Sequence, residues 1–392
     1  MFSKNYKRCN CEGGLILRNL LLIQGVGFVK GMIHSFISWF LPILVMNRLG
    51  SIAFSLVFTM RFVMFFAHLL GGYLADLSRK WTLALSDALL ISFLVCLLLL
   101  HSSAVGLLFL VFLWYFYYAL PTAAAQLLRM ESVPSGWRGK ILTIAPALAT
   151  ASYAVGSVVF GYIYTVHGLT LLLQVMLVLA FIALISRIFL IETVHRKRGR
   201  SEYFREVFSL IKDRSYIWFV ITALFIGMAL NAKVFLSPYM KNVLKLNIMT
   251  IATLYALFEV VSAVGSIYLG HVLDVHRHEI PRIFALYLLT DGIVIALAMI
   301  LSTMNPILIS IIAVSEVISS TYFAAISLYV NERYENVKGI ALMSARALVD
   351  LAAFTRPITG LLWIYSPQLA IILTTTTIPL IVAATILRTK IK

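Results

Sequence analysis

Long apolar runs separated by short polar gaps constrain this chain more than any other feature of its sequence. A bilayer core about 30 Å thick is crossed by about 20 consecutive apolar residues in a helix, and runs of that length recur throughout the sequence. With 61% hydrophobic and 12% charged residues, the composition lies far from that of soluble proteins, in which about a quarter of the residues are charged. An all-α integral membrane protein is therefore predicted, with the lipid bilayer as its surroundings.

The apolar runs number about twelve, and each is predicted to be a transmembrane helix. They lie near residues 19–46, 50–75, 81–101, 104–129, 138–165, 168–191, 215–242, 248–273, 281–302, 305–331, 339–365 and 367–387. The first run is long enough to span and lacks a small-residue cleavage site, so it is expected to be a membrane helix and not a removed signal peptide.

Lysine and arginine collect in alternate gaps between these runs. The gaps predicted to be cytoplasmic hold most of the cations, whereas the outer gaps hold only Arg48, Lys241 and Lys245. By the positive-inside rule both termini are cytoplasmic, which requires an even number of spans. The net charge of +16 then faces anionic inner-leaflet lipid, so nucleic-acid binding is not expected, and the plasma membrane is the expected location.

The longest gap, residues 192–214, falls at mid-chain and carries many charges. It is predicted to be a cytoplasmic linker, partly an amphipathic helix on the membrane surface. The expected organisation is a cytoplasmic N-terminus at 1–18, a six-helix bundle at 19–191, the linker at 192–214, a second six-helix bundle at 215–387 and a cytoplasmic C-terminus at 388–392.

The two predicted bundles share short sequence similarities in the same order. "GGYLADLSR" at 71–79 has a counterpart in "GHVLDVHRH" at 270–278, which aligns Asp76 with Asp274. Two further pairs lie at nearly the same offset, Glu131 with Glu332 and Pro42 with Pro238. Repeats of this length indicate two pseudo-symmetric halves of six helices each.

Two six-helix halves, cytoplasmic termini, a mid-chain linker and a Gly-x-x-x-Asp motif followed by cations resemble the major facilitator superfamily. The resemblance covers residues 18–388. The family motif between helices 2 and 3 is Gly-x-x-x-Asp-Arg-x-Gly-Arg-Lys, of which this sequence keeps Gly72, Asp76, Arg79 and Lys80. It departs from the motif at Leu77 and lacks the loop glycine. The resemblance implies a monomeric secondary transporter that works by alternating access.

Charged residues at the inner ends of the helices are expected to form a cytoplasmic gate that breaks when the halves rock. The predicted gate residues are Gly72, Asp76, Arg79, Lys80, Glu131 and Arg138 in the first half, and Asp274, Arg277, Glu332 and Lys338 in the second. Asp76 is expected to pair with a nearby cation. The alternative is that these cations only anchor the topology.

Ionisable residues inside the bilayer are candidate functional sites because they are costly unless paired or hydrated. In the family fold, helices 1, 4, 7 and 10 line the cavity, which implies cavity positions for Lys30, Lys233 and Glu316. Lys30, His34 and Ser38 recur every four residues and share one helix face. Glu316 is the first choice for a proton-carrying carboxylate, and a structural Lys30–Glu316 ion pair is the alternative.

Helices 2 and 11 pack together in the family, which makes an Arg61–Asp350 pair at the outer gate an expectation. A local pair between Arg346 and Asp350, four residues apart, is the alternative. Asp350 and Glu259 are further candidates for proton coupling. Arg356 is expected to turn inwards because of a kink at Pro357. Asp87 and Asp291 are expected to be structural partners of other residues and not ligands.

An aromatic run, "LWYFYYALP" at 113–121, lies in the fourth predicted helix. Trp114, Tyr117 and Tyr118 are expected to offer ring faces and hydroxyls to a solute, although packing or an interfacial belt is the commoner role of such a run. Asn231 is a weaker polar candidate. The predicted substrate-binding set is thus Lys30, His34, Ser38, Trp114, Tyr117, Tyr118, Asn231, Lys233 and Glu316.

The candidate functions narrow to transport. The three cysteines lack zinc spacing and no nucleotide-binding loop is present, so no metal, cofactor or ATP-driven mechanism is predicted. No catalytic constellation supports an intramembrane enzyme. The expected activity is alternating-access transport of a small, anionic or carboxylate-bearing solute, driven by protons, another ion or the solute gradient. The alternatives are a hydrophobic drug exporter and a non-transporting sensor with a transporter fold.

Overall fold

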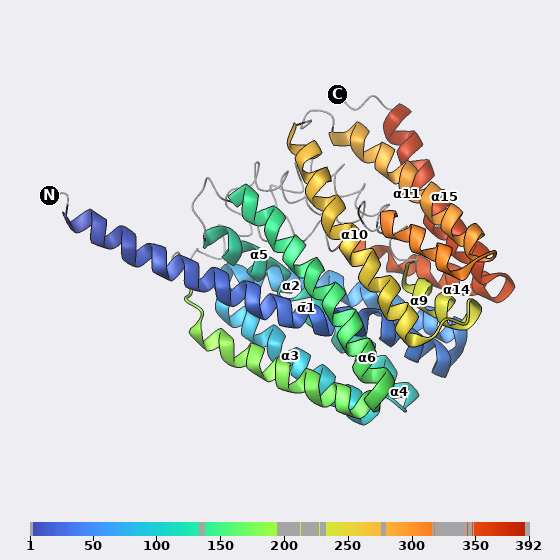
Figure 1. Cartoon of the computed structure of the whole chain (residues 1–392), viewed down its shortest axis with the longest axis horizontal. Helices are drawn as coiled ribbons and strands as arrows, with labels where there is room; N and C mark the ends of the chain where they lie inside the picture. The colour runs from blue at the N-terminus through green and yellow to red at the C-terminus, as the bar shows by residue number, and fades with distance from the viewer. Residues whose placement is uncertain are drawn as a thin grey trace.

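The computed structural model is all-helical in the part of the chain that it describes (Figure 1). It describes residues 3–132, 138–193, 212, 227, 233–275, 280–315, 317, 343, 347 and 349–388. Residues 3–193 are called the N-terminal segment below, and the described residues from 233 to 388 the C-terminal segment.

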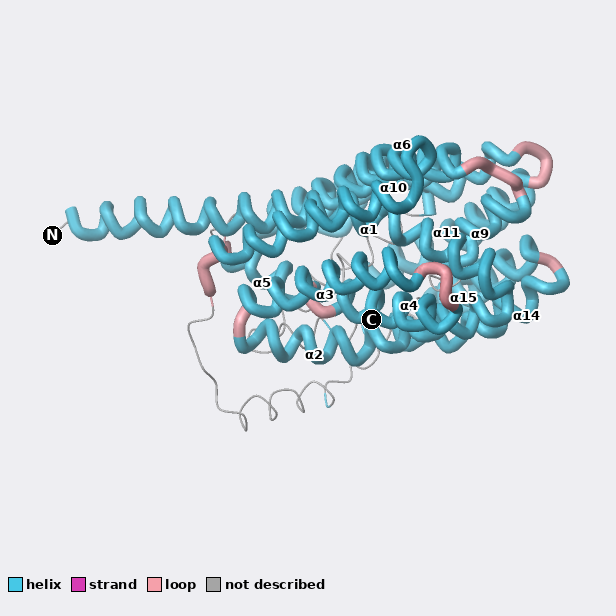
Figure 2. The backbone as a smooth tube through the Cα atoms, turned by 90° about the horizontal axis from the view of Figure 1, so that it is seen from below, coloured by secondary structure: helices cyan, strands magenta, loops and turns pink. Residues whose placement is uncertain are grey.

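The N-terminal segment follows the predicted helices closely. Its elements are α1 (Ser3–Thr59), η1 (Met60–Phe62), α2 (Val63–Leu77), α3 (Arg79–Leu100), α4 (Ala104–Ala119), α5 (Thr122–Glu131), α6 (Arg138–Ser186) and η3 (Arg187–Phe189). The first part of α1 extends beyond the packed helices in both views (Figures 1 and 2).

Elements of the C-terminal segment are more often interrupted. They are η4 (Lys233–Phe235), α9 (Leu236–Pro238), the π-helical turn η5 (Tyr239–Val243), α10 (Ile248–Val275), α11 (Ile280–Ser302), η7 (Pro306–Ile312), η8 (Ala352–Thr355), α14 (Arg356–Tyr365) and α15 (Pro367–Arg388). The predicted run at 305–331 therefore opens as a 3₁₀-helix, and the run at 339–365 changes to 3₁₀ geometry before Arg356.

Two glycines mark the breaks between predicted helices, although the helical hydrogen bonding continues across each break. Gly50, with φ of 76°, divides α1, and Gly168, with φ of 79°, divides α6. Glycine adopts this left-handed conformation without the penalty that a Cβ atom brings. The breaks coincide with the first residues of the predicted runs 50–75 and 168–191.

The predicted fourth run, 104–129, forms one apolar segment of spanning length, Ala104–Arg129, with an internal division. It divides into α4 and α5 at Leu120 and Pro121, because proline has no N–H to donate to the preceding turn. The start of α3 has a conventional cap, since the Ser78 side chain accepts a hydrogen bond from the Trp81 N–H.

Five segments of the described chain are long and apolar enough to cross a membrane. They are Arg18–Leu77, which includes the Gly50 break, Arg79–Leu100, Ala104–Arg129, Ala147–Phe189 and Ile248–Gly265. These segments indicate an integral membrane protein. The number of crossings and the sidedness of the termini stay predictions.

Glycine allows several of these helices to approach each other closely. An added Cβ atom on Gly156 of α6 would collide with the Met32 backbone of α1, and one on Gly71 of α2 would collide with the Leu120 carbonyl. Small residues at such crossings are the usual means by which membrane helices pack. α1 and α6 therefore form one closely packed pair.

Contacts between the N-terminal and C-terminal segments are extensive along α6 and α10, which lie side by side in Figure 1. A Cβ atom on Gly161 would lie 2.7 Å from the Ala252 methyl group, and the Trp39 and Tyr255 rings stack with centroids 6.1 Å apart. This contact, which we call the apolar seam, is built from small and aromatic side chains.

Candidate functional site

A cavity of about 230 Å³ lies between the N-terminal and C-terminal segments. Its described lining comes from α1, η1, α2, α4, η4 and α14: His34, Ser38, Leu41, Pro42, Phe58, Arg61, Met64, Trp114, Tyr115, Tyr118, Lys233, Val234 and Arg356. Three cations and several aromatic rings thus share one space with apolar side chains. Such a lining suits a small solute with a charged group and an apolar body.

Five residues of the predicted substrate-binding set line this cavity, namely His34, Ser38, Trp114, Tyr118 and Lys233. Lys30 and Tyr117 do not line it. Because Lys30 lies one turn before His34, a single polar face of the first helix was expected. Different parts of that face meet different surroundings: His34 and Ser38 contact the cavity, whereas Lys30 contacts α3.

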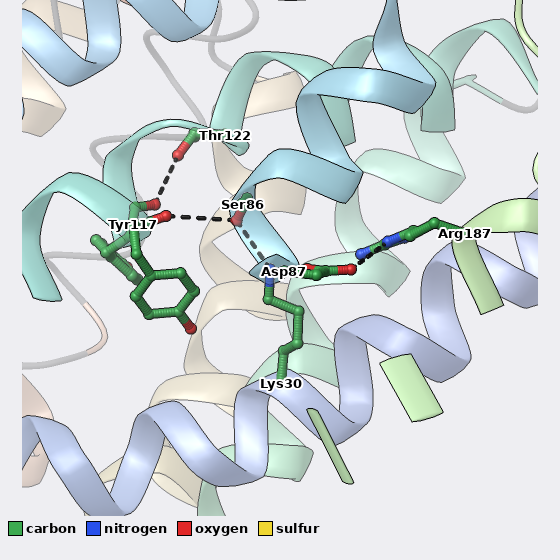
Figure 3. A network of polar contacts seen from close by, with 7 residues as sticks. Lys30, Ser86, Asp87, Tyr117, Thr122 and Arg187 are labelled. Atoms are coloured by element: carbon green, nitrogen blue, oxygen red, sulfur yellow. Dashed lines mark hydrogen bonds and ion pairs between the residues drawn. The ribbon is translucent and has the colours of Figure 1, made fainter. Parts of the chain in front are cut away.

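The Lys30 ammonium is held by a buried carboxylate inside the N-terminal segment (Figure 3). Its Nζ lies 2.5 Å from Asp87 Oδ1 and donates to Ser86 Oγ at 3.1 Å. Arg187 of η3 contacts the other Asp87 oxygen, with Nε to Oδ2 at 2.6 Å. The Tyr117 ring lies beneath Lys30, 5.2 Å from Nζ to the ring centroid. Lys30 and Tyr117 are therefore parts of a structural network.

His34 packs against two aromatic rings of α4, which also stack on each other with centroids 6.4 Å apart. Its ring centroid is 4.5 Å from that of Trp114 and 4.1 Å from that of Tyr118, and both pairs are nearly parallel. Tyr153 of α6 approaches from a third direction at 5.5 Å. This stack holds the Trp114 and Tyr118 rings in place at the cavity wall.

The structure brings Arg61 and Asp350 together across the two segments. Arg61 Nε donates to Asp350 Oδ1 at 2.7 Å, and His68 Nε2 lies 3.0 Å from Asp350 Oδ2. His68 and Asp350 are each 4% exposed, whereas Arg61 is 24% exposed and lines the cavity. One carboxylate from the C-terminal segment is thus shared by two side chains from the N-terminal segment.

Arg356 reaches the cavity as expected from the proline that follows it. α14 begins at Arg356 with Pro357 in its first turn, directly after the 3₁₀ turn η8. Although it is only 1% exposed, the guanidinium lines the cavity, where Nη1 donates to the Phe58 carbonyl and, at 2.8 Å, to Tyr115 Oη.

Lys233 is the third cation of the cavity and belongs to the C-terminal segment. Its Nζ donates to Ser315 Oγ at 2.7 Å and lies 4.0 Å from Asp291 Oδ1. Asp291 is buried on α11 and serves as a structural partner, as does Asp87. Both carboxylates lie outside the described lining of the cavity.

Residues of the predicted cytoplasmic gate meet at the end of α2 and the start of α3. Arg79 Nη2 donates to Glu131 Oε1 at 2.9 Å, and its Nη1 donates to the Ala75 carbonyl. The Lys80 ammonium donates to the Ile188 carbonyl at 2.8 Å. Gly72 is buried on α2, and Asp76 lies half-buried near its end.

Glu192, at the start of the predicted linker, caps α3. Its carboxylate accepts from the backbone N–H groups of Arg79 and Lys80, both at 3.2 Å, and from the Ser78 hydroxyl. A helix N-terminus favours such an anion, because unpaired N–H groups and the helix dipole both point towards it. The chain following the sixth predicted helix is therefore fastened to the loop between helices 2 and 3.

Several predicted residues lie outside the described residues: Asn231, Arg277, Glu316, Glu332, Lys338 and Arg346. The backbone alone is described for Arg138 and Asp274, which begin α6 and lie near the end of α10, respectively. Glu259 is half-buried on α10, within electrostatic reach of Tyr153. The described residues contain no cluster of three or more His, Cys, Asp or Glu side chains that would hold a metal ion.

Sequence reasoning missed Tyr115 and the apolar residues of the cavity lining, one member of the Lys30 network and one residue of the gate. Tyr115 lines the cavity and Arg187 completes the Lys30 network, whereas Glu192 completes the gate. A helical projection of the aromatic run gives no signal for Tyr115, because positions 117, 114 and 118 span about 100° of the helix, as do positions 114, 118 and 115. Nothing in the linker sequence marked Glu192 as a cap for a helix far away in sequence.

Comparison with known families identifies the scaffold. Residues 25–357 match the family model of the Major Facilitator Superfamily. The chain belongs to this superfamily. Among curated protein sequences, none matches, so the family model carries the assignment by sequence.

Solved structures of several transporters share the fold. The nucleoside transporter NupG aligns over 94% of this chain and 99% of its own, with 11% identity and a TM-score of 0.72. A D-xylose–proton symporter covers 94% and 97%, with 13% identity and a TM-score of 0.73. An auto-inhibited peptide transporter of the POT family covers 96% and 97%, with 11% identity and a TM-score of 0.71. At these identities the similarity shows the fold alone.

Proposed function

We propose that this superfamily member is a secondary transporter that moves a small anionic solute across the plasma membrane by alternating access. The proposal includes twelve spans in two six-helix halves, with both termini and the linker in the cytoplasm. The choice of an anionic solute rests on the cavity, because Arg61, Lys233 and Arg356 line it and the described lining contains no carboxylate. A solute with one negative group would be attracted to this part of the cavity.

The solute is expected to be amphipathic. Trp114, Tyr115 and Tyr118 face the same space as the cations, so an apolar or aromatic body fits beside the charged group. A volume of about 230 Å³ is below the common range of about 300 to 1,000 Å³ for ligand pockets. The solute is therefore expected to be smaller than most drugs.

Alternating access is supported by charged contacts at the predicted cytoplasmic end and beside the cavity. The pairing of Arg79 with Glu131 and the capping by Glu192 fasten the predicted cytoplasmic end. Arg61 and Asp350 connect the two segments beside the cavity. Contacts of this kind have alternative partners and suit a molecule with two discrete states.

The test is a thermal-shift screen of the purified protein against permanently charged anions, neutral sugars and lipophilic cations. Benzenesulfonate, gluconate, xylose and tetraphenylphosphonium represent these classes. An anion at about 100 times its dissociation constant should add about 2.7 kcal/mol to the free energy of unfolding. Lys233→Met should weaken its binding about 10- to 100-fold, because one charge-assisted hydrogen bond contributes about 1.5 to 3 kcal/mol.

Lys241→Met is the matched control, since Lys241 lies on η5 outside the described cavity lining. Equal loss in both variants would show a general electrostatic effect and contradict the cavity assignment. Stabilisation by tetraphenylphosphonium alone would replace the anion proposal with the hydrophobic drug exporter, which the aromatic lining favours. Binding without counterflow in liposomes would indicate a non-transporting sensor.

A further inference from the structure

Ser38 gives the cavity a hydrogen-bonding group of a different kind from its cations. It lies on α1, is exposed, and lines the cavity. Its hydroxyl donates to the Ser35 carbonyl of the same helix at 2.7 Å. A hydroxyl has one hydrogen to donate and two lone pairs that accept. Because the hydrogen of Ser38 is bound to the backbone, the oxygen offers the cavity its accepting capacity only.

The cations of the cavity have the opposite property. Arginine and lysine side chains carry N–H donors and no acceptor, so Arg61, Lys233 and Arg356 suit the negative group of a solute. These residues come from η1, η4 and the start of α14, whereas Ser38 comes from α1. A solute with a negative group alone would pair with the cations and bring no donor for the Ser38 oxygen.

His34 adds a second polar atom to the wall that holds Ser38. Its Nδ1 is buried and has no hydrogen-bond partner among the described residues, although buried polar atoms are nearly always paired. His34 lies one turn before Ser38 and also lines the cavity, and residues four apart share one face of a helix. The protein thus leaves two polar atoms on this face for a partner in the cavity.

We propose that the solute carries a hydroxyl group as well as its negative charge, and that Ser38 and His34 form the subsite for this hydroxyl. The solute hydroxyl donates to Ser38 Oγ, which is its first contact because Ser38 is exposed. It accepts from His34 Nδ1 when the imidazole carries a hydrogen there, after a small shift of the ring. This inference rests on the proposed function, since it assigns a second group to the same anionic solute.

The charge and size of the cavity favour a hydroxyl over other donors. An ammonium group could also donate to Ser38, but three cations line the same space, and a further positive charge beside them is unfavourable. The volume of about 230 Å³ keeps the negative group and the hydroxyl on one small body. The solute class is therefore a small hydroxy acid or phenolic acid, and amino acids are disfavoured.

Matched sulfonates test the hydroxyl without changing the charge. Para-hydroxybenzenesulfonate and para-toluenesulfonate share the negative group and have nearly the same shape, and the two meta isomers present the substituent at a second angle. Dissociation constants are measured by thermal shift of the wild-type protein, at a pH well below that at which phenols ionise. In at least one pair the hydroxyl compound should bind about two- to tenfold more tightly, which is the effect of one neutral hydrogen bond.

The wild-type comparison separates this inference from the proposed function. Binding of the sulfonates with no preference for the hydroxyl compound in either pair would overturn the hydroxyl subsite and leave the anion proposal intact. Absence of binding by all four sulfonates would refute the anion proposal and the subsite together. Neither result depends on a variant that folds.

Variants then locate the partner of the hydroxyl. The readout is the ratio of the dissociation constant of the methyl compound to that of the hydroxyl compound, because a general effect on anion binding cancels in it. Ser38→Ala should lower this ratio to one or below, since an unpaired hydroxyl is more costly to bury than a methyl group. His34→Phe keeps a ring that can stack and should lower the ratio in part.

Ser92→Ala is the matched control. The Ser92 hydroxyl likewise donates to a carbonyl of its own helix, that of Ala88, but Ser92 lies outside the described lining of the cavity. This variant should keep the wild-type ratio. A wild-type ratio in Ser38→Ala, or an equal fall in Ser38→Ala and Ser92→Ala, would overturn the assignment to Ser38, and a wild-type ratio in His34→Phe would remove His34 from the subsite.

Discussion

Replacing Asp87 with asparagine is expected to destabilise the protein by about 3 to 5 kcal/mol. The carboxylate is fully buried and contacts Lys30 Nζ at 2.5 Å and Arg187 Nε at 2.6 Å. Each pair corresponds to about 6 kcal/mol of Coulomb attraction at an effective dielectric constant of about 20. Burying the Asp87 carboxylate costs desolvation energy, and Asp87→Asn removes this cost together with the attraction. The net loss is therefore smaller than the attraction itself. The remaining loss reflects two buried cations without a counter-charge.

A second substitution should recover part of the loss. Asp87→Asn combined with Lys30→Met leaves one uncompensated cation, Arg187, where the single variant leaves two, so the double variant should be more stable than Asp87→Asn. The free energy of unfolding can be followed by circular dichroism in mixed micelles of a mild detergent and dodecyl sulfate. Ser92→Ala, on the exposed face of α3, is the control for changes that do not affect the network.

The double-mutant cycle isolates the Lys30–Asp87 coupling from other effects of the substitutions. An Asp87→Asn variant within about 1 kcal/mol of the wild type would show that the network contributes little. Failure of Lys30→Met to recover any stability would show that the cost arises from lost packing or from Arg187. Either result would refute a charge-balanced role for this network.

Three further predictions concern the gate and the helix packing. Glu192→Gln should lower the free energy of unfolding by about 1 kcal/mol, because it weakens the cap on α3. In a chain without its three native cysteines, the same substitution should speed maleimide labelling of Ser132→Cys. Unchanged labelling would exclude Glu192 from the gate. Gly156→Ala should destabilise by about 1 to 3 kcal/mol, because its methyl group would collide with the Met32 backbone, and wild-type unfolding of this variant would contradict the close packing. Gly50→Ala should cost about 1 to 2 kcal/mol through its left-handed φ alone, since its surroundings are open, and unfolding midpoints that match the wild type would show that the break relaxes.

The apolar runs predicted the helices of the N-terminal segment well, because length and hydrophobicity decide whether a segment can cross a bilayer. Glycine and proline marked most of the interruptions. The division at Pro121 was missed because the flanking residues remain apolar on both sides, so hydropathy alone does not distinguish a broken helix from a straight one.

Side-chain partners were predicted less well than helices. Arg61 and Asp350 could be paired because the family fold implies which helices adjoin. Lys30 was assigned to the cavity by its spacing from His34, yet spacing defines a helix face and not the neighbour that the face contacts. Asp87 is adjacent to Lys30 only because α1 and α3 pack together, which no local pattern encodes. The capping by Glu192 was unpredictable for the same reason.

Two of the contacts between the segments differ in chemistry, and this difference has an evolutionary consequence. Along the apolar seam, Gly161 and Ala252 pack by size alone, and a Cβ atom on Gly161 would collide with the Ala252 methyl group, so a larger residue at one position requires a smaller one at the other. Beside the cavity, Asp350 is held between Arg61 and His68, and a change in one of these leaves a buried charge behind. Related sequences should therefore conserve the summed side-chain size at Gly161 and Ala252 but change Arg61 and Asp350 together, so that an alignment would show covariation by size at one contact and by charge at the other.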